Sequence, residues 1–261
     1  MKFFSFPIIQ GQDQNGGDPY LIAPGVLAYA VGAALVVAGL FMIGQPARVV
    51  PPPVVSTSAA HSAREIIHGD TSKKQIIFTF DGGDGNQSAQ GILAALAKHH
   101  VKGTFFLTGK FVEANPALVN QMKAAGHEIF SHTYSHPHLT DLTDAQISDE
   151  LTIMAETLNK VAGISPQPYF RAPYGDRDDR VRTDAFKAGY ESVYWTIDAR
   201  DWEESTGETA DQVKNIILST AAPGNIYLMH FGDTITGAIL DDVMTTLEQR
   251  GYRMVSLTQG L

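Results

Sequence analysis

Short apolar or β-branched runs alternate with segments of helical periodicity from about residue 73 to the end of the chain. This alternation predicts a parallel sheet whose strands are joined by helices, wound open or closed into a barrel. The clearest helix covers residues 144–161, where Thr143 and Gln146 form a capping box and Gly163 follows the end. Thr209 and Gln212 form a second capping box before the helix predicted at 213–218. We predict strands at 75–80, 103–107, 128–131, 168–170, 192–197, 225–229 and 253–257, and further helices at 87–98, 116–125, 179–187, 213–218 and 240–249.

Polar side chains follow five of these strands, each at its carboxyl end. Barrels of alternating strands and helices build their sites from several strand ends on that one face. An open doubly wound sheet would gather its site near one switch point and usually carry a glycine-rich phosphate loop, whose spacing GGDG at 82–85 lacks. The pattern therefore favours an α/β barrel with parallel strands. The residues concerned are Asp81, His132, His136, Arg171, Asp198, Asp201, Trp202 and His230.

The N-terminal region is different, because no charged residue lies between Asp18 and Arg48. Residues 21–43 are almost wholly apolar, and about twenty such residues in a helix span a bilayer core. The run is too long for the apolar core of a cleavable signal peptide, and nothing amphipathic surrounds it to bury it as a soluble helix. We predict a tail at 1–20, a transmembrane anchor at 21–46, a proline-rich linker at 47–72 and a folded domain at 73–261.

Charge and composition restrict the location of the folded domain, the kinds of site it can contain and the kinds of partner it can bind. Lys2 precedes the apolar run, which weakly favours an inside N-terminus and so a folded domain outside the cytoplasm at the cell membrane. The chain has no cysteine, which excludes disulfides, a thiol nucleophile and thiolate metal sites. The net charge of −9 and the lack of a basic run argue against nucleic acid as a partner.

His132 and His136 stand four residues apart, directly after a predicted strand. In one helical turn, ended by Pro137, both imidazoles would share a face and could bind one metal ion. Neighbouring histidines are also common on solvated surfaces and in cores. Their place at a strand end, with Asp81 on a neighbouring strand, favours the metal site.

Asp81 and His230 are the candidate base and acid. Asp81 ends a strand without other charges, and a carboxylate suffices as base towards a water whose pKa a metal ion lowers. Arg171 is expected to pair with Asp81 and orient it, unless it is a surface cation. Asp198 and Asp201 could raise the pKa of His230 so that it protonates a leaving group, although a core histidine is the alternative.

Five ordered motifs carry a resemblance to a known family: TFDGG at 79–83, SHTYSHP at 131–137, RAPYG at 171–175, DARDW at 198–202 and LMH at 228–230. Together they resemble the polysaccharide deacetylase family, which is carbohydrate esterase family 4 or the chitooligosaccharide deacetylase homology domain, over about residues 73–260. The resemblance implies a distorted (β/α)7-type barrel and metal-dependent removal of N- or O-acetyl groups from a polysaccharide.

The resemblance also implies catalytic roles. Asp81 would be the base, Arg171 would orient it, and Asp201 would tune His230 as the acid. The backbone N–H of Tyr174 would help to hold the oxyanion.

Other roles that the resemblance implies concern binding. His132 and His136 would hold the metal, and Trp202 and Leu228 would line the acetyl pocket. The residue types agree, since Trp202 and Leu228 offer apolar surfaces for a sugar face or an acyl methyl, although Leu228 could equally be a core residue.

One position departs from the family's pattern. Its first motif usually has two adjacent aspartates, the second a metal ligand, whereas this chain has Gly82. A catalytic zinc ion normally has three protein ligands plus water. Either Asp84 reaches back from the loop or waters complete a weaker site, which we expect to take zinc, cobalt or another divalent ion.

We therefore expect an envelope-anchored, metal-dependent deacetylase that acts on N-acetylated amino sugars of the cell wall, such as those of peptidoglycan or chitin. The alternative is a catalytically silent glycan-binding barrel that has lost its metal aspartate. Hydrolysis of phosphate esters is a weaker alternative because no basic phosphate-binding cluster accompanies the histidines.

Overall fold

The central strand is β2 (Gln75–Gly82), all eight residues of which are buried. In the computed structural model, which describes residues 63–261, β2 pairs with β3 on one side, with β8 on the other, and with β9 at its start. The strands follow the order β1-β6-β5-β4-β3-β2-β8-β7, and every pairing is parallel. The remaining strands are β1 (Glu65–Ile66), β3 (Thr104–Leu107), β4 (Glu128–Ser131), β5 (Tyr169–Phe170), β6 (Glu191–Val193), β7 (Ile197–Asp198), β8 (Ile226–His230) and β9 (Arg253–Val255).

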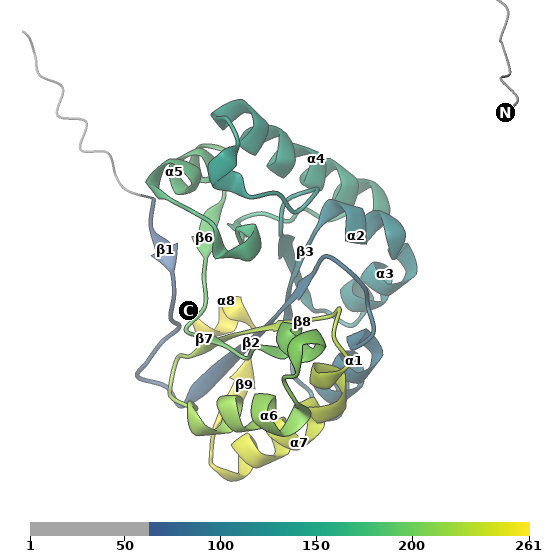
Figure 1. The fold of residues 1–261 in the computed structure, drawn as a ribbon, viewed down its shortest axis with the longest axis vertical. Helices are drawn as coiled ribbons and strands as arrows, with labels where there is room; N and C mark the ends of the chain where they lie inside the picture. Colours follow the sequence, from purple (N-terminus) through teal and green to yellow (C-terminus); the bar gives the residue numbers. More distant parts are fainter. Residues whose placement is uncertain (1–62) are drawn as a thin grey trace, which may run out of the picture. The chain divides into compact units, whose positions relative to one another are not determined.

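The helices form an arc around the outside of the strands, while β1 lies at an edge that the arc leaves uncovered (Figure 1). Both predicted capping boxes are present, at Thr143 and Thr209, and Gly163 ends its helix in the left-handed conformation with φ of 65°. The helices are α1 (Ala89–Lys98), α2 (Gly109–Ala114), α3 (Pro116–Ala124), α4 (Asp144–Ala162), α5 (Asp179–Lys187), α6 (Ala210–Ser219), α7 (Ile235–Gln249) and α8 (Leu257–Gly260).

Alternation along the strands separates two layers of side chains. On β2, Phe78 and Phe80 belong to the outer core that packs against the helices. Ile77 belongs to a smaller core on the inner side of the curved sheet. Asp81 has the same parity as Ile77, so its side chain is delivered to the inner side at the strand's carboxyl end.

The sheet is a half-barrel rather than a barrel closed by strand pairing, because within residues 63–261 no ladder joins β1 to β7. The class, α/β with parallel strands, is confirmed. The predicted strand 192–197 is split between β6 and β7: Tyr194 N donates to Ile66 O at 2.8 Å, whereas Thr196 N donates to Ile226 O at 2.8 Å. The segment thus changes neighbours between these residues.

Among the boundaries that differ from the prediction are those of β1, β9 and α7. The folded part begins upstream of residue 73, because β1 lies in the predicted linker 47–72 and pairs with β6. The predicted strand 253–257 ends at Val255, since Ser256 begins α8 with a capping box. The predicted helix 240–249 begins earlier, at Ile235.

The predicted tail 1–20, the predicted transmembrane helix 21–46 and residues 47–62 of the linker lie outside the described residues. Within residues 63–261, none of the helices combines the length and the apolar character needed to cross a bilayer.

Candidate active site

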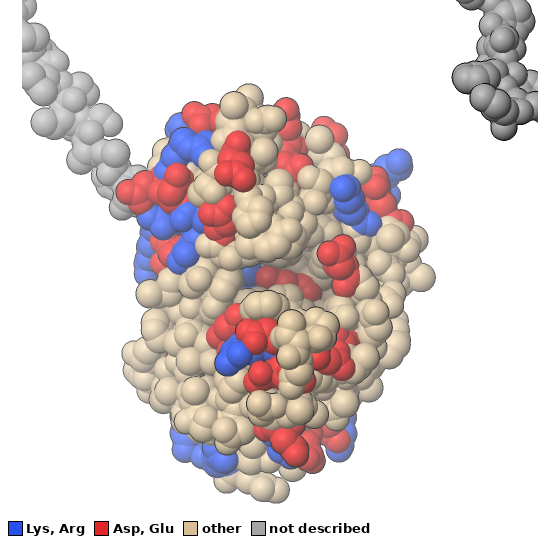
Figure 2. Space-filling model, in the orientation of Figure 1, with Lys and Arg blue, Asp and Glu red and all other residues tan. Residues whose placement is uncertain are grey.

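A pocket of about 640 Å³ opens at the carboxyl ends of the strands. Figure 2 shows this hollow with acidic side chains around it. Two predicted residues, Arg171 and Asp201, lie fully buried behind the residues that line the pocket. The predicted residues that line it are Asp81, Asp84, His132, His136, Tyr174, Asp198, Trp202, Leu228 and His230.

Asp81 and Arg171 form a buried ion pair. Arg171 Nη1 donates to Asp81 Oδ1 at 2.7 Å, and the two side chains are 0% and 5% exposed. The guanidinium also donates to the backbone oxygens of Val193 and Tyr194, and its Cζ atom lies 4.2 Å from the centre of the Phe106 ring. Since Oδ1 is engaged by Arg171, Asp81 presents Oδ2 to the pocket.

His132 and His136 come together beside Asp81, with their ring centres 4.9 Å apart. His132 Nδ1 lies 2.9 Å from the backbone oxygen of Arg171, which can only accept, so Nδ1 carries the proton. The unprotonated Nε2 therefore faces Asp81 Oδ2, 3.5 Å away. Burial lowers the pKa of His132 to about 4 and also lowers that of His136, so both rings are neutral near pH 7.

The segment after β4 is not the helical turn that the spacing of the histidines predicted. Thr133 and His136 both take a left-handed backbone conformation, with φ of 66° and 65°. Glu150 on α4 stabilises this turn: its Oε2 accepts from the backbone N–H groups of Tyr134 and Ser135, both at 2.8 Å, and its Oε1 accepts from Ser135 Oγ. The imidazoles meet because an external carboxylate holds the loop, not because a helix places them on one face.

Asp201 contacts two nitrogen atoms of His230, the ring Nδ1 and the backbone N. Nδ1 lies 2.8 Å from Asp201 Oδ1, and the backbone N–H donates to Oδ2 at 2.7 Å. Burial alone would lower the pKa of His230, but the hydrogen bond and the charge of Asp201 outweigh burial and raise it to about 9. The ring is therefore an imidazolium at neutral pH, with Asp201 as its direct partner.

Asp198 contributes to the same side of the pocket in another way. Its Oδ2 accepts from Trp202 Nε1 at 3.2 Å, which fixes the orientation of that ring. Trp202 is 54% exposed, so its ring is a surface rather than part of the core. Leu228, only 4% exposed, contributes an apolar wall deeper in the pocket.

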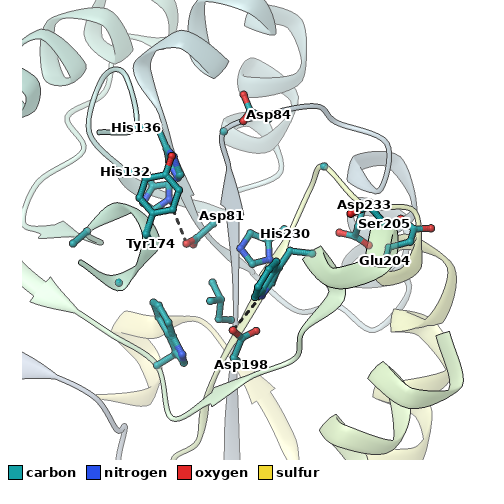
Figure 3. Close-up of a pocket in the computed structure, with 17 residues that line it drawn as sticks. Asp81, Asp84, His132, His136, Tyr174, Asp198, Glu204, Ser205, His230 and Asp233 are labelled. Carbon is teal, nitrogen blue, oxygen red and sulfur yellow. Dashed lines mark hydrogen bonds and ion pairs between the residues drawn. The ribbon is translucent and has the colours of Figure 1, made fainter. Parts of the chain in front are cut away.

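Tyr174 lies on the opposite side of the pocket from His230 (Figure 3). Its backbone is left-handed, with φ of 58°, inside the short turn Pro173–Gly175. The Tyr174 ring stacks on His138, with ring centres 4.1 Å apart, and His138 is in turn bonded to Asp176. This stack stabilises the strained turn that carries the backbone N–H predicted to hold the oxyanion.

Two neutral imidazoles are suitable ligands for zinc or a similar divalent ion. Asp84 is not brought to them: its side chain is exposed and points away from the histidines in Figure 3. Within residues 63–261, no cluster of three histidine or acidic side chains is arranged to hold a metal ion. The donor chemistry fits, with two imidazoles as the protein's ligands; a ligand role for Asp84 stays a prediction.

Gly82 and Gly83 face opposite sides of the sheet. A β-carbon on Gly82 would lie 2.7 Å from Leu107 Cδ2 and 2.9 Å from Phe231 Cδ2, in the outer core. A β-carbon on Gly83 would lie 3.6 Å from His136 Cδ2 and 4.0 Å from its Nε2. In this chain the position that faces the imidazoles is therefore Gly83.

Sequence reasoning missed two acidic residues that shape the site. Glu150 holds the histidine loop, and Asp233 lines the pocket beyond His230. Glu150 adjoins the apolar stripe of α4, next to Leu151, which is the one sequence signal that could have drawn attention to it. Its loop partners are set by tertiary structure.

Comparison with known proteins identifies the family to which the chain belongs. The model of the polysaccharide deacetylase family matches residues 68–193. The peptidoglycan-N-acetylmuramic acid deacetylase PdaA of Bacillus subtilis is 36% identical over 189 residues, 72% of this chain and 72% of that protein. The chain belongs to the polysaccharide deacetylase family. A peptidoglycan-N-acetylglucosamine deacetylase of Bacillus cereus is 33% identical and covers 72% of this chain and 69% of its own length.

Solved structures of the polysaccharide deacetylase family agree. The Bacillus subtilis PdaA structure, a family 4 carbohydrate esterase, matches with a TM-score of 0.72 and 35% identity, over 75% of this chain and 84% of that one. A family 4 pseudoenzyme from Bacillus anthracis matches with a TM-score of 0.71 and 29% identity, over 76% and 69%. The predicted family and enzyme class are confirmed.

Substitutions at the two glycines should separate their roles in metal binding. We expect Gly83→Asp to tighten zinc binding at least about tenfold, because its carboxylate would join the imidazoles. Gly82→Asp should not tighten it, and should destabilise the fold by about 1–3 kcal/mol through a carboxylate forced into the outer core. Competition with a chromogenic zinc chelator and urea unfolding measure these effects. Tighter binding by Gly82→Asp alone would contradict this assignment.

The pH profile should report His230. Because the pKa of His230 is raised to about 9, its acid form is present below that pH, and activity that requires it should fall as pH rises through about 9. Asp201→Asn removes the charge that raises the pKa, so the basic limb of kcat/KM should move towards or below the ordinary value of 6.5. Asp242→Asn, a surface control, should leave the limb in place.

Proposed function

We propose that this polysaccharide deacetylase removes acetyl groups from the N-acetylated amino sugars of a cell-wall glycan in a metal-dependent reaction. The observation that carries the proposal is the register of β2 and β8, in which Asp81 is paired with His230. A base and an acid thus stand on neighbouring strands above one pocket, with the imidazole pair next to the base. This arrangement suits hydrolysis of an amide bond.

The residues divide the proton transfers between them. Asp81 Oδ2 takes the proton of the attacking water, and Arg171 keeps the carboxylate oriented through Oδ1. His230 gives its proton to the amine nitrogen as the carbon–nitrogen bond breaks, which yields acetate and a free amino sugar. Asp201 stabilises the imidazolium that makes this possible.

His132 and His136 would hold a divalent ion, with zinc proposed and cobalt or another ion as substitutes. Such an ion supplies a water of lowered pKa and polarises the acetyl carbonyl. The backbone N–H of Tyr174 is proposed to donate to the developing oxyanion. Leu228 and Trp202 would pack against the acetyl methyl group and the sugar ring, respectively.

The charge of the pocket supports an uncharged sugar. Its lining includes Asp84, Asp198, Glu204 and Asp233 but, among the described residues, neither lysine nor arginine. Apart from the His230 imidazolium and the proposed metal ion, which face the acetyl group, a substrate carboxylate beside these groups would meet like charge without a lysine or arginine to compensate it. We therefore propose N-acetylglucosamine units as the substrate in preference to N-acetylmuramic acid, whose lactyl group bears a carboxylate.

Acetate release tests the proposal. The full-length protein, loaded with zinc or cobalt, should release acetate from N-acetylglucosamine oligomers several-fold faster than from matched oligomers that contain N-acetylmuramic acid. Asp81→Asn should lower kcat by at least about a hundredfold, since general base catalysis contributes that much. Asp242→Asn serves as the surface control.

The alternative of a silent glycan-binding barrel makes the opposite prediction. If wild type and Asp81→Asn both bind the oligomers but neither releases acetate, the hypothesis of a glycan-binding barrel replaces that of a deacetylase. The presence of the Asp81–Arg171 pair and of the Asp201–His230 pair supports the hypothesis of an active deacetylase.

We also propose that residues 21–46 anchor the chain in the cell membrane, with the catalytic domain outside the cytoplasm. The long uncharged run supports this placement, since it matches the length of a bilayer span. Cell fractionation with protease accessibility of the full-length chain tests it. A chain found in the soluble fraction would contradict the anchor.

A further inference from the structure

Asp233 is a buried carboxyl group that the proposed mechanism does not use. It lies between β8 and α7, three residues after His230, and its side chain is only 5% exposed. Its Oδ1 accepts from Thr236 N at 2.7 Å and from Ser88 Oγ at 3.3 Å. Its Oδ2 is buried without a hydrogen-bond donor in the described part of the chain. Capping the start of α7 therefore explains one of its oxygens and leaves the other unexplained.

The neighbour of this carboxyl is Asp201. Thr236 contacts both groups, since its backbone N–H donates to Asp233 and its Oγ donates to Asp201 Oδ2 at 2.6 Å. Burial, and then the charge of Asp201, raise the pKa of Asp233 to about 7, and a hydrogen bond between the two side chains acts in the same direction. Two buried carboxylates this close favour sharing one proton.

The proton belongs on Asp233. Burial tends to raise the pKa of Asp201, but the hydrogen bond and charge of His230 outweigh burial and lower it. Within residues 63–261, Asp233 makes no such contact with a cation. The acidic groups near it are Asp84, next to Gly232; Glu204, which accepts from Thr234 N; and, in the same pocket, Asp81 and Asp198. The pocket also contains the imidazoles of His132, His136 and His230, of which His230 is paired with Asp201.

We propose that Asp233 is a positioning residue that donates a hydrogen bond to Asp201 and thereby sets how strongly His230 holds its proton. With its proton in place, Asp233 draws negative charge away from the imidazolium, which becomes a better acid. Once ionised, Asp233 adds a second negative charge behind Asp201, and His230 retains its proton to higher pH. The inference rests on the proposed role of His230, but it can be tested by a titration that does not require catalysis.

Asp233→Asn tests the inference, because the amide keeps an acceptor for Thr236 N and cannot gain negative charge. In the full-length protein, NMR titration of the His230 imidazole, assigned by comparison with His230→Gln, should show a midpoint lower by about one pH unit than in wild type. The basic limb of the kcat/KM profile should move by the same amount. Asp233→Ser, another good capping residue without charge, should shift the midpoint in the same direction and covers the case in which the asparagine variant fails to fold.

A matched control makes the same substitution at a similar cap elsewhere. Asp178 accepts from Val181 N at the start of α5, so Asp178→Asn should leave the His230 midpoint unchanged. A lower melting temperature with an unchanged midpoint in both Asp233 variants would reduce Asp233 to a helix cap and overturn the proposal. If the Asp233 variants shift the His230 midpoint but the wild-type protein releases no acetate, this coupling is upheld while the proposed function fails.

Discussion

The buried ion pair between Arg171 and Asp81 connects the architecture of the sheet to its chemistry. Arg171 donates to the backbone oxygens of Val193 and Tyr194, where the chain leaves β6 and changes neighbours before β7. The same guanidinium fixes the carboxylate of Asp81. Removing one partner of such a buried pair costs about 3–5 kcal/mol, because the other charge is left without compensation. One side chain therefore both binds the backbone where the sheet changes neighbours and orients Asp81, the proposed base.

The two-residue period of the strands explains the assignment of neighbouring residues to different tasks. At the end of β2, Asp81 faces the pocket, whereas Gly82 faces Leu107 and Phe231 in the outer core. A small residue suits that second position, since any β-carbon there would crowd both side chains. The departure of this chain from the family's first motif is thus accommodated by packing, and the imidazole pair keeps an open side next to Gly83.

Most of the fold could be predicted from the sequence because the strongest signals in the sequence are local. Capping boxes at Thr143 and Thr209 and polar residues at strand ends are properties of short segments, and the structure contains them where they were expected. The split of 192–197 was not predictable, since it depends on which strands lie beside Tyr194 and Thr196. Asp233 was missed for a similar reason: its proximity to Asp201 arises only when β8 and the turn after β7 meet.

The segment from Asp198 to Trp202 combines two duties within five residues. Asp201 raises the pKa of His230, the proposed acid, while Asp198 orients the Trp202 ring at the rim of the pocket. A loop exchange in this segment would therefore alter ligand preference and proton donation together. Evolution or design that seeks a new glycan at constant rate is therefore limited, in this segment, to changes at Trp202 that leave Asp198 and Asp201 in place.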